Sequence, residues 1–172
     1  KFGENNIIAV KVNHQTPSSR WYSGSGIYRN VDLVVTDPVH IGYSGVKVVA
    51  KNIDSYNGSG TLNLDVSTIL TNSGNSAKTV TVKHTVIPKA GGEAIGTATK
   101  QSISLGAGAT LSDTTTLAAQ APKLWSLKNP VQYIVKTEIF EDSAVLDTVE
   151  TATGFRKLTL IPTLALPSMA KR

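Results

Sequence analysis

The feature that most constrains the fold is a strict alternation of apolar and polar residues within short segments of the chain. In residues 61–70 the side chains of Leu62, Leu64 and Val66 fall on one face. Residues 78–87 repeat the pattern with Val80 and Val82, and His84 and Val86 follow in the same series. A period of two residues is that of a β-strand with one buried face. These segments therefore predict sheets that pack against each other.

Turn residues separate the alternating segments, as at 57–60, 72–75 and 91–92, where Gly, Asn and Ser cluster. Roughly seven strands result, which predicts an all-β fold, an immunoglobulin-like antiparallel β-sandwich. The strand segments lie at residues 46–52, 61–70, 78–87, 94–100, 102–105, 110–117, 131–141 and 144–153. A short turn near residues 118–121 is the one weak helical candidate.

Two further strands are predicted ahead of the sandwich, at residues 7–13 and 28–36. The stretch between them is rich in Ser, Gly and Pro and predicts a loop. Asp37-Pro38 then interrupts the pattern, because proline fixes its own φ and restricts the residue before it. We therefore place a domain boundary there. The predicted domains are residues 1–37, residues 38–157 and a tail of residues 158–172.

Composition excludes several classes of function. The chain has 172 residues and no cysteine, so it has neither a disulfide framework nor a thiolate metal site, and its compartment stays open. The net charge of +5 comes from scattered Lys and Arg residues, which favours a solvated surface over a nucleic-acid partner. No segment is apolar for long enough to span a bilayer, so no membrane partner is expected.

The sequence offers no recognisable catalytic or metal-binding constellation. Hydrolysis of a glycoside needs two carboxyl groups that flank one bond, but the acids here lie mostly in turns or on polar faces. Glu138 and Glu150 can face each other across the final hairpin, where like charges indicate exposure rather than catalysis. His14, His40 and His84 show no metal-ligand spacing, so no metal or other cofactor is expected. We expect His84 to be hydrogen-bonded and partly buried.

Three segments carry a resemblance to a known family. The first contains Ser-Arg-Trp-Tyr at residues 19–22 and Gly-Ile-Tyr-Arg at residues 26–29. The second is Pro-Lys-Leu-Trp-Ser at residues 122–126, followed by Pro130 and Tyr133, and the third is Gly-Phe-Arg at residues 154–156. In this order and spacing they resemble glycoside hydrolase family two, the β-galactosidase-like enzymes. The resemblance frames residues 6–156.

The resemblance implies that residues 1–37 are the end of a jelly-roll sugar-binding domain and that the immunoglobulin-like second domain follows. It also implies a catalytic (β/α)8 barrel after that domain, and neither catalytic Glu of the barrel maps onto this chain. The predicted function is therefore a non-catalytic spacer of a β-galactosidase-like enzyme, with the barrel and the rest of the jelly roll as its partners. β-Glucuronidases and β-mannosidases share this architecture.

The resemblance singles out Arg20 and Trp21 as residues that contact sugar in the parent enzyme. An Arg side chain offers several donors, and Trp offers a flat stacking face. The alternative is that both residues brace their loop against the jelly roll. Trp125, in the second segment, is expected to be a packing anchor at the end of the sandwich.

The residues of the tail do not match the sequence that the family has at this point. Codons compatible with residues 160–171, read in another frame, encode Phe-Asp-Pro-Asn-Thr-Gly-Phe-Thr-Leu-Asn-Gly-Lys, which resembles the family's entry into the barrel. Our hypothesis is a frame shift between residues 155 and 160, and the alternative is a natural short protein with an unrelated tail. Sequencing of the source DNA distinguishes the two.

Two expectations about partners remain. Strands taken from a jelly roll leave apolar faces and open edges, so we expect self-association through residues 1–36. The alternative function is a stand-alone carbohydrate-binding or adhesion module, for which a sandwich usually displays a row of exposed aromatic rings. Several of the aromatic residues of the sandwich match core positions of the family, which favours the spacer. These aromatic residues are Tyr43, Tyr56, Trp125, Tyr133, Phe140 and Phe155.

Overall fold

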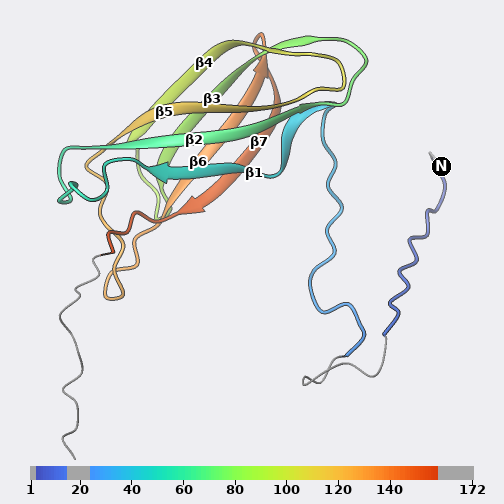
Figure 1. Cartoon of the computed structure of the whole chain (residues 1–172), viewed down its shortest axis with the longest axis horizontal. Helices are drawn as coiled ribbons and strands as arrows, with labels where there is room; N and C mark the ends of the chain where they lie inside the picture. Colours follow the sequence, from blue (N-terminus) through green and yellow to red (C-terminus); the bar gives the residue numbers. More distant parts are fainter. Residues whose placement is uncertain (1–2, 15–23, 159–172) are drawn as a thin grey trace, which may run out of the picture. The chain divides into compact units, whose positions relative to one another are not determined.

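The structure is a computed structural model that describes residues 3–14 and 24–158. The chain divides into two units, Lys1–Val35 and Thr36–Arg172, and each is described by itself. The second unit contains all the regular strands of the described residues (Figure 1).

The second unit is an antiparallel β-sandwich, as the alternation predicts. Three strands form one sheet in the order β1-β2-β5, and four form the other in the order β4-β3-β6-β7. No helix occurs among the described residues. The strands are β1 (Val39–Ala50), β2 (Thr61–Asn72), β3 (Lys78–Pro88), β4 (Gly96–Leu105), β5 (Thr110–Gln120), β6 (Tyr133–Glu141) and β7 (Ala144–Thr153).

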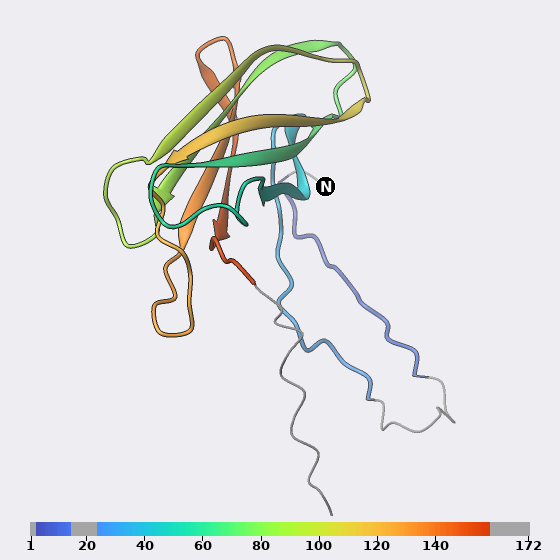
Figure 2. The ribbon, with the colours of Figure 1, turned by 60° about the vertical axis from the view of Figure 1, so that its left-hand side comes forward.

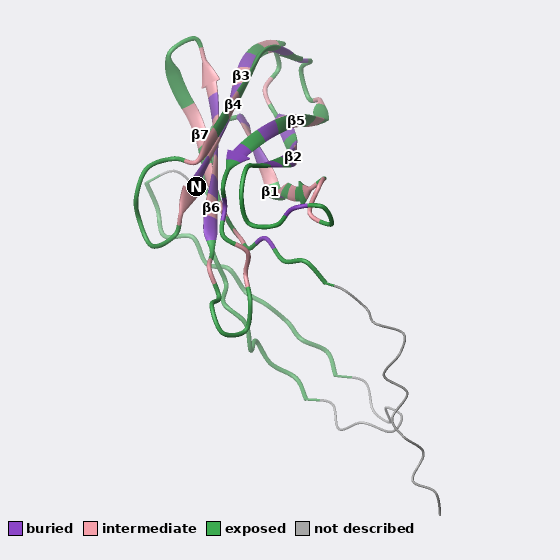
Figure 3. Cartoon of the chain, turned by 90° about the vertical axis from the view of Figure 1, so that its left-hand side faces the viewer, coloured by how far each residue is buried: buried purple, intermediate pink, exposed green. Residues whose placement is uncertain are grey.

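The core lies between the two sheets and follows the predicted faces. Buried and exposed residues alternate along the strands (Figure 3). On β2 the side chains of Leu62, Leu64, Val66 and Leu70 have no exposed surface at all. Burial of apolar side chains of this size contributes about 1.5–3 kcal/mol each to folding, so this face stabilises the packing of the strand against the opposite sheet.

A polar layer divides this core into two apolar clusters. Thr68, His84 and Thr137 are each at most 1% exposed and come from β2, β3 and β6. One cluster contains Leu64, Val66 and Tyr133, and the other contains Leu70, Val80 and Ile139. Each polar residue therefore falls between members of the two clusters along its own strand.

A large bulge in β1 departs from the predicted strand at residues 46–52. The strand begins at Val39, but the six positions from Ile41 to Val46 face only the three positions of β2 from Leu70 to Thr68. Ser44 adopts a φ of 52° inside the bulge. Because the inserted residues break the alternation, the residues before them do not look like part of the same strand.

The fourth strand unites two predicted segments, 94–100 and 102–105. Val80 pairs with Ile103 and Val82 with Lys100, so β4 carries one extra residue at this point. Ser102 adopts a φ of 57°, which is typical of a bulge that uses a left-handed residue.

The helical turn predicted at residues 118–121 is wrong. β5 continues through Ala119, which pairs with Leu62 and is fully buried. Pairing with the central strand β2 outweighs the local helix preference of alanine.

The first unit has no regular strand in its described residues, although strands are predicted at 7–13 and 28–36. A strand needs a neighbour to satisfy its backbone groups, and the described residues provide none. Its apolar side chains remain exposed, among them Ile7 at 93%, Leu33 at 86% and Val35 at 84%. The predicted tail lies outside the described residues except for Leu158.

Candidate functional site

Four loops gather at one end of the sandwich. They comprise residues 51–60, 89–95, 121–132 and 154–158, which lie where β1, β3, β5 and β7 end. The strand registers place these ends together, because β2 and β6 begin where their antiparallel neighbours finish. Figure 2 shows the loop of residues 121–132 projecting from this end in orange. We call the four loops the loop end of the sandwich.

Hydrogen bonds fix the longest loop to the strands. The backbone N–H of Trp125 donates to the carbonyl oxygen of Phe155 at 2.8 Å. The N–H of Lys123 donates to the Tyr133 hydroxyl at 2.7 Å. The residues that carry the family resemblance thus hold the loop in place, and Trp125 lies half-buried at the end of the sandwich.

The tip of this loop is a closed turn. Ser126 and Asn129 exchange two backbone hydrogen bonds of 2.9 and 3.1 Å, and the Ser126 hydroxyl accepts another from the Asn129 N–H at 3.0 Å. Leu127, at the tip, is 90% exposed. The turn therefore holds an apolar side chain out into solvent in a defined position.

Arg156 lies over the indole ring of Trp125. Its guanidinium carbon is 5.6 Å from the ring centroid, which is within the range of a cation–π interaction. Gly154 lies beside the same ring, and a Cβ atom there would be 3.3 Å from Trp125 Cδ1. The small residue at position 154 therefore allows the segment after β7 to approach the indole closely.

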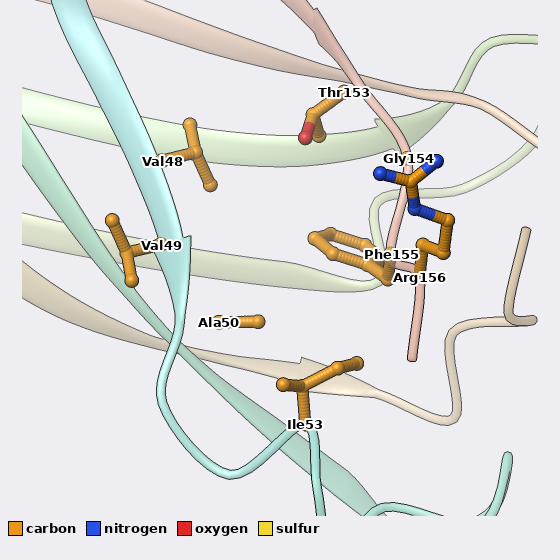
Figure 4. A pocket seen from close by; sticks show the side chains of 8 residues that line it. All are labelled: Val48, Val49, Ala50, Ile53, Thr153, Gly154, Phe155 and Arg156. Atoms are coloured by element: carbon orange, nitrogen blue, oxygen red, sulfur yellow. The ribbon is translucent and has the colours of Figure 1, made fainter. Parts of the chain in front are cut away.

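Two shallow hollows flank this pair. One, of about 220 Å³, is lined by Trp125, Gln132, Gly154 and Arg156. The other, of about 280 Å³, is lined by Val48, Val49, Ala50, Ile53, Thr153, Gly154, Phe155 and Arg156. Figure 4 shows the ring of Phe155 pointing toward the β1 residues of the larger hollow. Neither hollow has a carboxylate in its lining, so neither offers the acid pair that glycoside hydrolysis requires.

Several acidic side chains of the sandwich make contacts of their own on its strands. Asp65 accepts a hydrogen bond from Thr116 and pairs with Lys51 at 3.3 Å, and these contacts lower its pKa. Glu141 pairs with Lys78 at 2.7 Å, which raises the pKa of the lysine. Such contacts favour the ionised carboxylate and are typical of a solvated structural role.

Glu138 and Glu150 do not face each other as the sequence suggested. In the final hairpin Glu138 lies opposite Thr148, and Glu150 lies opposite Lys136. The register is shifted by two residues from the one that would align them. Glu138 instead forms an ion pair with Lys136 at 2.7 Å.

His84 is more deeply buried than predicted. It is 1% exposed, and its Nδ1 lies 3.0 Å from the Thr137 hydroxyl. Burial lowers its pKa from 6.5 to about 4, against a smaller opposing effect of the Asp113 carboxylate. The ring is therefore a neutral member of the core at pH 7.

The described residues contain no group of three or more His, Cys, Asp and Glu side chains that could hold a metal ion. They also form no helix of the length and apolarity needed to cross a membrane. The two residues predicted to contact sugar, Arg20 and Trp21, lie outside the described residues.

The sequence analysis did not predict that the side chains of Arg156 and Trp125 contact each other. Both residues belong to the resembling segments, but they are distant in the sequence, and no periodicity links them. The fold brings the two segments together, through the hydrogen bond between Trp125 and Phe155 and the contact of the Tyr133 and Phe155 rings.

Comparison with known proteins identifies relatives along nearly the whole chain. A β-galactosidase of Bacteroides ovatus is 34% identical over 93% of this chain, which corresponds to 18% of that enzyme. A β-glucuronidase of Formosa agariphila is 31% identical over 91% of this chain and 17% of its own length. The chain thus spans less than a fifth of the curated relatives it matches.

Solved structures with a similar fold also come from glycosidases. The solved structure of a β-glucuronidase from glycoside hydrolase family 2 superposes with a TM-score of 0.65 and 26% identity, over 71% of this chain and 13% of the other. The family model for glycosyl hydrolases family 2 matches residues 39–156, the whole of the sandwich and the Arg156 that follows it. The chain therefore belongs to the glycosyl hydrolases of family 2.

Proposed function

We propose that this chain is a non-catalytic β-sandwich spacer of a β-galactosidase-like glycosidase. The hydrolysis of terminal β-galactosides or related β-glycosides would then belong to a barrel domain that the chain does not contain. The spacer would hold the sugar-binding and catalytic parts of the enzyme in a fixed relation.

One observation carries the proposal: the family match covers the sandwich, while the hollows at its loop end lack the carboxylate pair of a glycosidase. The limited share of the relatives' length supports it. The closed core supports it as well, because side chains from both sheets fill the space between them.

A hydrolysis assay tests the absence of catalysis. The purified chain is incubated with a panel of nitrophenyl β-glycosides, and the Bacteroides ovatus β-galactosidase serves as the positive control. We expect turnover by the control and none by the chain. Turnover that co-purifies with the chain and disappears when one of its acidic residues is replaced would overturn the proposal.

The rival function, a carbohydrate-binding module, has less support in the sandwich. Tyr56, Tyr133 and Phe155 are at most 5% exposed, so they offer no stacking surface to a sugar. Tyr43 on β1 is 92% exposed, but one ring does not make the row of rings that such a module displays. Trp125 has one face near Arg156. Isothermal titration with galactosides separates the two functions, because saturable binding by the isolated chain would favour the module.

A further inference from the structure

The peptide bond between Asp37 and Pro38 lies near the start of the second unit, where the first strand of the sandwich begins. It is the one Asp-Pro bond in the sequence. Such a bond is chemically weak for two reasons. The aspartyl carboxyl can close a small ring onto the carbonyl carbon of its own residue, and the proline nitrogen is a tertiary amide nitrogen that leaves as a basic secondary amine. The spacer function makes no use of this bond.

The side chain of Asp37 is held beside this bond. Its Oδ1 accepts a hydrogen bond from the backbone N–H of Val39 at 3.1 Å. A hydrogen bond to the residue two positions further on folds the side chain back over the peptide bond between them, as in an Asx turn. Asp37 and Pro38 are both exposed. The carboxyl group therefore stays close to its own carbonyl carbon in the presence of water, and such proximity favours an intramolecular attack.

The carbonyl oxygen of Asp37 accepts a hydrogen bond from an imidazole ring. His40 Nδ1 lies 3.0 Å from this oxygen. Because a carbonyl oxygen can only accept, Nδ1 carries the hydrogen in this contact. His40 is half-buried on β1, where it pairs with Thr71 of β2, so the strand holds the ring in place. A donor at this oxygen stabilises the negative charge that develops there when the carbonyl carbon is attacked.

The proline side of the bond is fixed to the sandwich. The carbonyl oxygen of Pro38 accepts hydrogen bonds from the backbone N–H and the hydroxyl of Ser73, at 2.9 and 3.0 Å. Val39, which follows, is 2% exposed and pairs with Asn72 of β2. Pro38 therefore stays on the sandwich when the bond before it opens.

We propose that the Asp37–Pro38 bond is a self-cleavage site, with Asp37 as the nucleophile and His40 as the donor to the developing oxyanion. An oxygen of the protonated Asp37 carboxyl forms a bond to the backbone carbonyl carbon, the carboxyl proton passes to the proline nitrogen, and the C–N bond breaks. The products are a cyclic anhydride on Asp37 and a free secondary amine on Pro38. Water then hydrolyses the anhydride to two carboxyl groups. This activity goes beyond the spacer function and does not depend on it.

Acid should drive the cleavage, because the attacking carboxyl must carry the proton that the proline nitrogen receives. Lys78 of β3 interacts electrostatically with Asp37 and is itself paired with Glu141 at 2.7 Å. Its positive charge favours the ionised Asp37 carboxylate and so protects the bond at neutral pH. His40, which faces Asp37 from β1, keeps its Nδ1–H when a second proton binds to the ring, so it remains a donor in acid.

The test incubates the full 172-residue chain at about pH 5, between the ordinary pKa values of Asp and His, and at neutral pH. Denaturing electrophoresis follows the loss of intact chain, and N-terminal sequencing with mass spectrometry locates the cut. The variants are His40→Ala, His40→Gln and Asp37→Ser, whose hydroxyl can still accept the Val39 N–H. The matched control is Asp54→Ser, which replaces an exposed aspartate that serine follows. Circular dichroism checks that each variant folds, and the wild-type chain in urea at the same pH gives the rate without the fold.

We expect fragments that end at Asp37 and begin at Pro38, formed in acid about tenfold faster or more by the folded chain than in urea. His40→Ala should slow the folded chain by about tenfold or more, as for the loss of an oxyanion donor, and His40→Gln, which keeps a donor, should lose less. Asp37→Ser should stay intact, and Asp54→Ser should cleave as the wild type does. The proposal is overturned by a folded chain that cleaves no faster than the unfolded one, by His40→Ala at the wild-type rate, by a cut elsewhere or by no cut. The glycoside assay decides the spacer function separately.

Discussion

At the scale of single residues, the polar layer of the core shows how a buried polar group is tolerated. His84 and Thr137 satisfy each other through one hydrogen bond, and the ring stays neutral. Asp113 is the charged group that acts on the ring, and its carboxylate is itself paired with Lys100. A buried ring that stays neutral in the fold but gains a proton on unfolding makes stability depend on pH.

Acid should destabilise the sandwich through His84. Because the pKa is about 4 in the fold and 6.5 in the unfolded chain, the unfolded state binds more protons between these values. Stability is therefore complete above pH 6.5 and falls as the pH drops toward 4, by about 3 kcal/mol on the scale of 1.36 kcal/mol per pKa unit. Urea unfolding at several pH values measures the loss.

The variant His84→Gln carries no titrating ring at this position and can still bond to Thr137, so its unfolding free energy should vary much less between pH 4 and 6.5. His40→Gln is the matched control and should keep the wild-type slope. Equal slopes for wild type and His84→Gln would contradict the account.

Two threonines of the same layer should respond oppositely to removal of the hydroxyl. Thr68 Oγ1 is buried and has no hydrogen-bond partner among the described residues, whereas Thr137 Oγ1 bonds to His84. Thr68→Val should be neutral or stabilising by up to about 1 kcal/mol, and Thr137→Val should cost about 1–3 kcal/mol because it leaves a buried ring nitrogen unpaired. Chemical denaturation at pH 7.5 compares the two, and an equal loss for both would refute the distinction.

At the scale of elements, alternation predicts strands where the register is regular and fails where it is broken. β2 and β3 were predicted closely, because their buried faces follow one parity throughout. The start of β1 was not predicted, and β4 was predicted as two segments, because each strand contains a bulge that breaks the alternation. In both bulges a serine, Ser44 or Ser102, adopts a positive φ. Non-glycine residues with positive φ leave no reliable local signal.

In the candidate site, too, the sequence indicated individual segments but not the contacts between them. Resemblance drew attention to Trp125 and to the segment that ends at Arg156, because both lie in distinctive motifs. The stacking of the two side chains depends on which loops share an end of the sandwich, and that is a property of topology.

The β1 bulge should depend on glycine at position 45. A Cβ atom there would lie 2.5 Å from the backbone oxygen of Gly42, which cannot move without disturbing the bulge. Gly45→Ala should therefore cost about 1–3 kcal/mol of unfolding free energy. Gly106→Ala is the control, because its nearest neighbour is the Ala109 Cβ at 3.6 Å. Thermal melts of the two variants test this, and an unchanged melting temperature for Gly45→Ala would show that the bulge adapts.

At the scale of the whole molecule, the two units differ in how far they bury their apolar side chains. The sandwich buries its apolar faces in two clusters, so it has the closed core of an independent domain. The first unit exposes most of its apolar side chains, and its described backbone forms no strand. Contiguous exposed apolar surface and unpaired backbone are features of surfaces that pair with other chains.

Self-association through residues 1–36 follows as a prediction for the isolated chain. Sedimentation velocity should show an average mass that rises with protein concentration, because contact with another copy removes the exposed side chains of Ile8, Val10 and Leu33 from water. Replacement of these three residues by serine should return the chain to a monomer. The single change Val145→Ser, on the exposed surface of β7, should leave association intact. A wild-type chain that stays monomeric at every concentration would mean that the exposed segment does not pair with itself.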